Sequence, residues 1–331
     1  MAFYRATNPD AWRGRVDGTD ADLLRWHQTI QICGPENLPP ILNGRQGVAF
    51  MGFCCDEGVR RSGGRIGAAN APDIIRKACS NFPLVADHII LADGGDVVCN
   101  QQDLEEAQGL MGQKISSIKN AGYLPIILGG GHETAYCGYL ALGQLPKQSE
   151  LGIINFDAHF DLRQPAANTG ASSGTWAWQI NEDCRHKKIP LHYLVLGIQQ
   201  YANTKRLFDL AAQSGFPYFL AEEFTNDQLH KMLNTINGIM ANSNTLLLSI
   251  DMDVFGAAFA PGVSAASFNG LAPNAMFKRL LRHIVLSGKV GCVDISEVNP
   301  NYDLDNRTAR LAAAFIFDIV QAADINAEYP G

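Results

Sequence analysis

The chain has 331 residues, of which 47% are hydrophobic, and a formal net charge of −7. Such a chain can bury a large core, and α/β proteins of this length often form one domain, so we expect residues 1–331 to fold as a single domain. The negative charge and the lack of a concentrated run of Lys and Arg argue against nucleic acid as a partner.

The cellular compartment follows from what the sequence does not contain. No apolar stretch is long enough to cross a bilayer, and the first residues lack the basic start and apolar core of a signal peptide. Eight cysteines are scattered without C-x-x-C spacing, as expected for reduced thiols. We therefore expect a cytoplasmic protein with no membrane partner.

Eight apolar runs are predicted to form strands, and most are too continuously apolar to be half exposed. They cover residues 47–53, 88–92, 124–129, 151–157, 192–198, 217–221, 245–251 and 290–296. Helical patterns between the strands cover residues 20–32, 72–80, 132–143, 203–213, 273–286 and 308–323. The alternation predicts an α/β fold, a three-layer α/β/α sandwich with a mainly parallel sheet of about eight strands.

Local signals indicate two more helix starts and one helix end. Asp103 with Glu106, and Thr225 with Gln228, resemble N-terminal capping boxes. Gly122 stands where a helix beginning near Asp103 would end.

Carboxylates and imidazoles follow four of the predicted strands directly. Parallel strands place their carboxyl ends at one edge of the sheet, and alternate residues of extended backbone face the same side. We therefore expect convergence of six candidate metal ligands, which are His132, Asp157, His159, Asp161, Asp251 and Asp253. Capping of turns is the alternative role for the aspartates, but it explains neither the repeated two-residue spacing nor the histidines.

The donor set predicts the chemistry. Oxygen and imidazole ligands without cysteine suit Mn²⁺ and its neighbours, and the number of ligands suits two ions. Paired ions usually share a water or hydroxide, which they acidify into a nucleophile at neutral pH. The sequence therefore predicts a binuclear metal hydrolase.

Four motifs carry a resemblance to a known family. They are Gly-Gly-Gly-His at 129–132, Asn-Phe-Asp-Ala-His-Phe-Asp at 155–161, Ser-Ile-Asp-Met-Asp at 249–253 and Ser-Glu-Val-Asn-Pro at 296–300. In this order and spacing they resemble the ureohydrolases, the binuclear manganese enzymes that include arginase and agmatinase. The resemblance implies two Mn²⁺ per subunit and a homo-oligomer, a trimer or hexamer. Asp157 and Asp251 would bridge the ions, with His132 and Asp161 on one and His159 and Asp253 on the other.

Further segments resemble one branch of that family, the formimidoylglutamases, which hydrolyse N-formimidoyl-L-glutamate to glutamate and formamide in histidine degradation. They lie at residues 12–15, 56–61, 161–163, 172–175, 260–265 and 307–310. The chain departs from the branch at Trp176-Ala177, where Pro-Phe is expected, and at Ala266, where proline is expected. Ser173 replaces the proton-shuttling histidine of arginases, which argues against a guanidino substrate.

The resemblance suggests a role for each further candidate residue. A metal-bridging hydroxide would attack the formimidoyl carbon of the amidine substrate, and Glu297 would balance the amidinium charge unless it pairs with Arg307. Asp161 would act as general acid toward the departing nitrogen. The substrate carboxylates would bind Arg163 and the Gly-rich-loop arginines, with Ser173 as a further hydrogen-bonding group; these loop residues are Arg60, Arg61 and Arg65.

Two other functions remain open from the sequence. The first is another ureohydrolase that acts on guanidinobutyrate, agmatine or arginine and releases urea. The second, more remote, is an inactive metal-binding scaffold.

Overall fold

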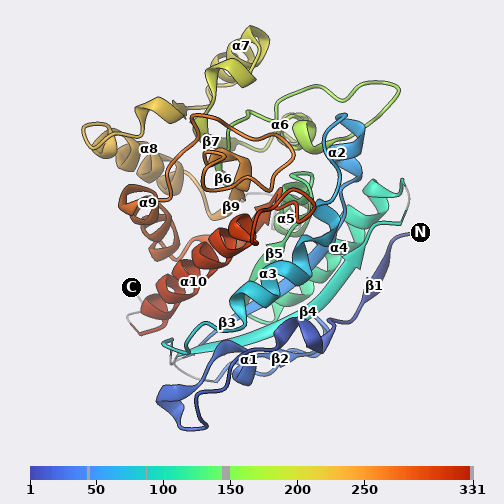
Figure 1. The fold of residues 1–331 in the computed structure, drawn as a ribbon. Helices are drawn as coiled ribbons and strands as arrows, with labels where there is room; N and C mark the ends of the chain where they lie inside the picture. The colour runs from blue at the N-terminus through green and yellow to red at the C-terminus, as the bar shows by residue number, and fades with distance from the viewer. Residues whose placement is uncertain (43–44, 87, 101, 144–149, 329–331) are drawn as a thin grey trace.

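A central sheet organises the computed structural model, which describes residues 1–42, 45–86, 88–100, 102–143 and 150–328 (Figure 1). All eight predicted strands are present, as β3 (Gln46–Cys54), β4 (Ile89–Val98), β5 (Tyr123–Leu128), β6 (Leu151–Phe156), β7 (Leu191–Ile198), β8 (Tyr218–Leu220), β9 (Thr245–Asp251) and β10 (Val290–Ser296). Two short strands that were not predicted, β1 (Phe3–Arg5) and β2 (Gln31–Ile32), join the edge of the sheet by pairing with β4.

The strand order is β1-β4-β3-β5-β10-β9-β6-β7-β8, with β2 also on β4. Of the strand pairs in the described sheet only β1–β4 is antiparallel, so the prediction of a mainly parallel sheet is confirmed. The last strand in the chain, β10, lies in the middle of the sheet between β5 and β9.

Helices cover both faces of the sheet and make the three predicted layers (Figure 1). Strand side chains alternate between two cores: Phe50 packs on one face and Met51 on the other. One core is completed by α3 (Ala71–Cys79), α8 (Leu229–Ala241), α9 (Ala275–Leu286) and α10 (Arg307–Glu328). The opposite core is completed by α4 (Leu104–Asn120), α5 (Thr134–Leu142), α6 (Trp176–Lys187) and α7 (Lys205–Gln213). Within the described part of the chain, none of the helices combines the length and the apolar character that a bilayer span requires.

The predicted helix over residues 20–32 is wrong. The segment forms only a short 3-10 helix (Ala21–Leu23) and one α-helical turn, α1 (Trp26–Thr29), because the first backbone N–H groups of α1 bond to the segment around Ser80 and Phe82. The Trp26 ring is buried against Phe50, Phe82 and Phe317, which fixes the segment on the sheet.

Both predicted capping boxes are also wrong. Asp103 occupies the N-cap of α4, but its carboxylate pairs with the amino terminus of Met1 and makes no capping bond. The helix α8 begins at Leu229, and Gln228 makes no side-chain cap either. The predicted helix end at Gly122 is confirmed: this glycine has φ +85° and its N–H bonds to the Lys119 carbonyl.

Strand β4 continues six residues beyond its predicted end because a buried arginine neutralises two aspartates within it. Arg76 on α3 donates from Nε to Asp93 Oδ2 at 2.7 Å and from Nη1 to Asp96 Oδ1 at 2.6 Å. The Trp12 indole N–H also bonds to Asp93 Oδ2, at 2.6 Å. Paired and hydrogen-bonded in this way, the two carboxylates can lie in the interior of the sheet.

Candidate metal centre

The predicted ligands converge at the carboxyl ends of four neighbouring strands. His132 follows β5, the segment 157–161 follows β6, Asp251 ends β9 with Asp253 two residues beyond it, and Glu297 follows β10. They surround a cavity of about 190 Å³ whose lining includes His132, His159, Asp161, Asp251, Asp253 and Glu297. Asp157 is fully buried behind them.

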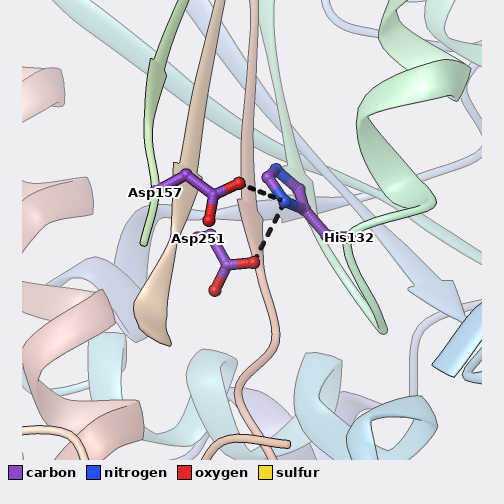
Figure 2. Close-up of side chains that lie close together, drawn as sticks. All are labelled: His132, Asp157 and Asp251. Atoms are coloured by element: carbon purple, nitrogen blue, oxygen red, sulfur yellow. Dashed lines mark ion pairs between the residues drawn. The ribbon is translucent and has the colours of Figure 1, made fainter. Parts of the chain in front are cut away.

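One imidazole nitrogen faces three carboxylate oxygens. Nδ1 of His132 lies 3.1 Å from Asp157 Oδ2, 2.9 Å from Asp161 Oδ2 and 3.0 Å from Asp251 Oδ2; two of these pairs are drawn in Figure 2. A ring nitrogen carries at most one hydrogen and cannot satisfy three acceptors. The arrangement therefore fits a cation bound among these four atoms.

The other nitrogen of His132 explains how the ring is oriented. Ser249 Oγ donates to Asp294 Oδ1 at 2.9 Å, so its oxygen is left to accept from His132 Nε2, 2.8 Å away. With the ring hydrogen on Nε2, the lone pair of a neutral His132 points from Nδ1 into the carboxylate cluster. This support from behind is typical of metal-binding histidines.

A second group of donors adjoins the first. Nδ1 of His159 lies 3.1 Å from Asp253 Oδ2 and 3.5 Å from Asp157 Oδ1. Two sets, His132 with Asp157 and Asp251, and Asp157 with His159 and Asp253, each bring their ligand atoms within 4.8 Å of one another. Because Asp157 belongs to both sets, the two candidate sites share a ligand.

We expected extended strands to bring ligands two residues apart to the same side, but turns do so instead. Strand β6 ends before Asp157, and Asp161 has a positive φ of 50°. Asp157 Oδ1 accepts from the His159 N–H at 2.6 Å, and Asp251 Oδ1 accepts from the Asp253 N–H at 2.7 Å. Each aspartate thus stabilises its turn with one oxygen and presents the other to His132, so capping and ligand roles coexist.

The ligand cluster carries buried negative charge, which is unfavourable unless cations are bound beside it. Burial and the nearby Asp253 raise the pKa of Asp251 well above its ordinary value. Burial and the neighbouring Glu133 raise the pKa of Glu297 to about 8. Burial lowers the pKa of His132, but the carboxylates of Asp251 and Asp157 outweigh it and hold that pKa well above normal. Divalent cations would compensate this charge directly.

These shifts predict how the stability of the metal-free protein depends on pH. Burial raises the pKa of Glu133 to about 7, and that of Glu297 is about 8. From roughly pH 4.5 upward the folded state therefore binds more protons than the unfolded state. The free energy of unfolding falls with rising pH until the pH exceeds about 8. The shifted pKa of Glu133 alone lowers the free energy of unfolding by on the order of 3 kcal/mol over this pH range.

In EDTA we expect a lower melting temperature at about pH 8.5 than at about pH 5.5. With Mn²⁺ we expect a higher melting temperature at about pH 8.5, because the protein ligands must lose their protons to bind the metal. Thermal unfolding followed by circular dichroism checks both. A metal-free protein that is more stable at the higher pH would contradict the assignment of buried, unpaired carboxylates.

Glu297 is placed to receive a cationic group. Its Oε1 accepts from the His132 backbone N–H at 2.9 Å, and its buried Oε2 has no hydrogen-bond partner among the described residues. The alternative pairing with Arg307 does not occur, because the Arg307 guanidinium donates to the Ala258 carbonyl at 3.0 Å.

Of the predicted substrate-binding residues, only Arg163 and Ser173 line the cavity. The three loop arginines do not, because each guanidinium is held elsewhere. Arg60 and Arg61 both pair with Glu57, and Arg61 also pairs with Glu105. Arg65 donates to two backbone carbonyls of the 263–264 segment and stacks on a tyrosine ring. The structure therefore does not bring these three arginines to the cavity, and their role in substrate binding stays a prediction.

Sequence reasoning also missed contributors to the site. Glu133 lies behind the cavity, where its Oε1 accepts from the Gly58 N–H at 2.9 Å. Ser62 and Ser264 line the cavity together with Ser173. The helix α6 was not predicted, although Trp176, Ile180 and Cys184 share its buried face at four-residue spacing, a signal that could have found it.

Comparison with known proteins gives the family. The profile described as the Arginase family matches residues 46–321. The chain belongs to the arginase family. The predicted ureohydrolase resemblance is thereby confirmed, and the arginase-family fold agrees with the sandwich described above.

Individual members of the arginase family are similar over almost the full chain. The formimidoylglutamase of Aeromonas salmonicida is 39% identical, covering 97% of this chain and 100% of its own. Among solved structures, formimidoylglutamase from Bacillus subtilis has a TM-score of 0.80 at 21% identity, covering 93% of this chain and 94% of its own. Trypanosoma cruzi formiminoglutamase with Mn²⁺ has a TM-score of 0.71 at 23% identity, covering 84% and 94%.

Proposed function

We propose that the protein is a formimidoylglutamase, which hydrolyses N-formimidoyl-L-glutamate to L-glutamate and formamide with two Mn²⁺ per subunit. The observation that carries the proposal is the cluster of three carboxylates on His132 Nδ1, beside a cavity that also contains Glu297 and Arg163. Relatives bearing this name along their whole length support the choice of substrate.

The donors fit manganese, and the six predicted ligands divide into two overlapping groups. His132, Asp157, Asp161 and Asp251 would hold one ion, and Asp157, His159, Asp251 and Asp253 the other. All are oxygen or imidazole donors, as Mn²⁺ prefers. When bound, the ions would supply positive charge and lower the pKa of a coordinated water, which provides the hydrolytic nucleophile at neutral pH.

The chain's own residues would bind and orient the substrate. Glu297 lines the cavity, its Oε2 has no partner among the described residues, and this carboxylate would hold the amidinium group. Arg163 would pair with a substrate carboxylate, since within the described chain no carboxylate pairs with its exposed side chain. Ser173, whose Oγ lies 3.2 Å from Ser62 Oγ, would hydrogen-bond but cannot shuttle protons as a histidine does.

Asp161 would move the proton in bond cleavage. The bond between the formimidoyl carbon and the glutamate nitrogen breaks, and that nitrogen needs a proton to leave as an amine. Asp161 lines the cavity and would carry this proton as the general acid.

Replacing Arg163 by Ala should raise KM for the acidic substrate about tenfold or more, with kcat nearly unchanged, because a charge-assisted hydrogen bond worth about 1.5–3 kcal/mol is lost. Arg60→Ala is the matched control, since Arg60 pairs with Glu57 outside the cavity, and it should leave KM within a factor of about two. Steady-state kinetics decide, and an unchanged KM in the Arg163 variant would remove this residue from the substrate site.

One assay tests the proposed function as a whole. Purified protein loaded with Mn²⁺ is offered formimidoylglutamate, guanidinobutyrate, agmatine and arginine, with separate detection of formamide and urea. Formamide release from the first compound alone is expected. Urea release from a guanidino compound would establish a different ureohydrolase, and inertness toward all four would point to a metal-binding scaffold.

We further propose that the chain assembles as a trimer or hexamer in the cytoplasm. Membership of the arginase family and the absence of a bilayer-spanning helix among the described residues support this. The mass measured by light scattering after size exclusion tests the assembly, and a monomer would refute it.

A further inference from the structure

We propose that Trp176 is a positioning residue for Asp161, and that its indole N–H fixes which carboxylate oxygen faces His132 and which faces the cavity. The Trp176 Nε1 donates to Asp161 Oδ2 at 2.6 Å, and both side chains are buried. The inference rests on the proposed function, because Asp161 serves there as both metal ligand and general acid.

Asp161 needs such a partner more than the other aspartates do. The carboxylates of Asp157 and Asp251 each accept a backbone N–H from two residues along the chain, which fixes their orientation. No backbone N–H of the described residues bonds to the Asp161 carboxylate, and its own backbone has the left-handed φ of 50°. Its orientation therefore depends on the indole.

The Trp176 ring is itself held firmly. It is completely buried at the start of α6, tilted against the His132 ring at a centroid distance of 5.0 Å and packed edge-on against Tyr193 at 5.8 Å. The backbone N–H of Trp178 donates to the Asp161 carbonyl at 3.2 Å. The first turn of α6 therefore grips both the main chain and the side chain of Asp161.

As a result, the two carboxylate oxygens of Asp161 lie on different sides of the site. Oδ2 receives the indole hydrogen and lies 2.9 Å from His132 Nδ1, on the metal side. The other oxygen, Oδ1, lies on the side of the cavity-lining Gly174: a Cβ added to this glycine would be 3.8 Å from it. Without the indole N–H the carboxylate could rotate about its last side-chain bond and exchange these positions.

The test compares Trp176→Phe with Trp178→Phe. The first keeps an aromatic ring against His132 and Tyr193 but removes the N–H donor, whereas Trp178 is half-buried on the same helix and its indole bonds to no described residue. Calorimetric titration of metal-free protein with Mn²⁺ should show one of the two sites weakened about tenfold or more in Trp176→Phe, and neither changed more than about twofold in Trp178→Phe.

Kinetics at saturating Mn²⁺ give a second measurement on the same variants. Trp176→Phe should lower kcat about tenfold and leave KM within about threefold, because the substrate carboxylate lies at Arg163. A third measurement uses the wild-type protein: the assigned indole N–H of Trp176 should exchange with D₂O far more slowly than that of Trp178.

The outcomes separate cleanly. The positioning role would be overturned if Trp176→Phe bound both Mn²⁺ ions and turned over as the wild-type protein does. It would also be overturned if the substitution weakened both ions equally, or if the Trp176 indole N–H exchanged fast. If the wild-type protein releases no formamide yet Trp176→Phe still weakens one ion selectively, the proposed substrate is wrong and the positioning role stands.

Discussion

Replacing Asp251 by Asn is expected to lower kcat/KM at least about a thousandfold, equivalent to about 4 kcal/mol of transition-state stabilisation, and to leave the protein with less than two Mn²⁺. Asp251 Oδ2 lies 3.0 Å from His132 Nδ1, and Asp251 is a ligand of both ions in the proposed division. A neutral amide oxygen is a much poorer ligand than a carboxylate there.

The same substitution should make the metal-free protein more stable. Burial and Asp253 raise the pKa of Asp251, which means that its charge is unfavourable in the empty cluster. The amide oxygen can still accept the Asp253 N–H, so the turn is kept. We expect the melting temperature in EDTA to rise by about 3 °C or more, while the stabilisation by added Mn²⁺ largely disappears.

Metal analysis and calorimetric melting of Asp251→Asn therefore show opposite effects with and without metal. Asp209→Asn is the control, since it removes the same charge from an exposed aspartate that pairs only with Lys205. A variant that retains two tightly bound Mn²⁺ and normal turnover would remove Asp251 from the ligand set.

Replacing Glu297 by Gln should reduce kcat about a hundredfold to a thousandfold, which corresponds to about 2.7–4 kcal/mol, the usual effect of removing one preorganised charge-stabilising group. Its Oε2 is buried and unpartnered among the described residues, and Glu297 lines the cavity. The Mn²⁺ content should stay unchanged because Glu297 is not among the six ligands.

The control for this prediction lies a short distance away. Like Glu297, Glu133 is buried, accepts one backbone N–H on Oε1 and has an unpartnered Oε2, but it is not among the residues that line the cavity. Glu133→Gln should therefore lower kcat less than about tenfold. Similar losses in both variants would mean that Glu297 acts through the shape of the buried cluster and not through contact with the substrate.

The strands and the metal cluster could be predicted because both depend on local patterns. Continuous apolar runs identify buried parallel strands, and the rule that their carboxyl ends share an edge then brings His132, Asp157 and Asp251 together without any tertiary information. The predicted backbone conformation was wrong. The ligands do not converge as alternate residues of extended strands, but through turns in which the aspartate carboxylates accept backbone N–H groups.

What was missed depends on partners distant in the chain. The end of β4 could not be placed because the charges of Asp93 and Asp96 are neutralised by Arg76 from another element. The loop arginines lie away from the cavity for two reasons. Glu57 pairs with Arg60 and Arg61 at helical spacing, which the sequence could have shown, whereas the pairing of Arg61 with Glu105 joins two distant segments. Pairing between oppositely charged side chains of distant segments is decided by tertiary geometry, which motif spacing does not encode.

The central position of β10 has a consequence for biosynthesis. This strand is the last to leave the ribosome, yet it separates β5 from β9 and completes the row of strand ends that carries the ligands. The two halves of the sheet cannot join until it inserts, and such long-range pairing is slow. Metal loading is therefore expected only after translation of nearly the whole chain, with the nascent protein exposing an unpaired strand edge until then.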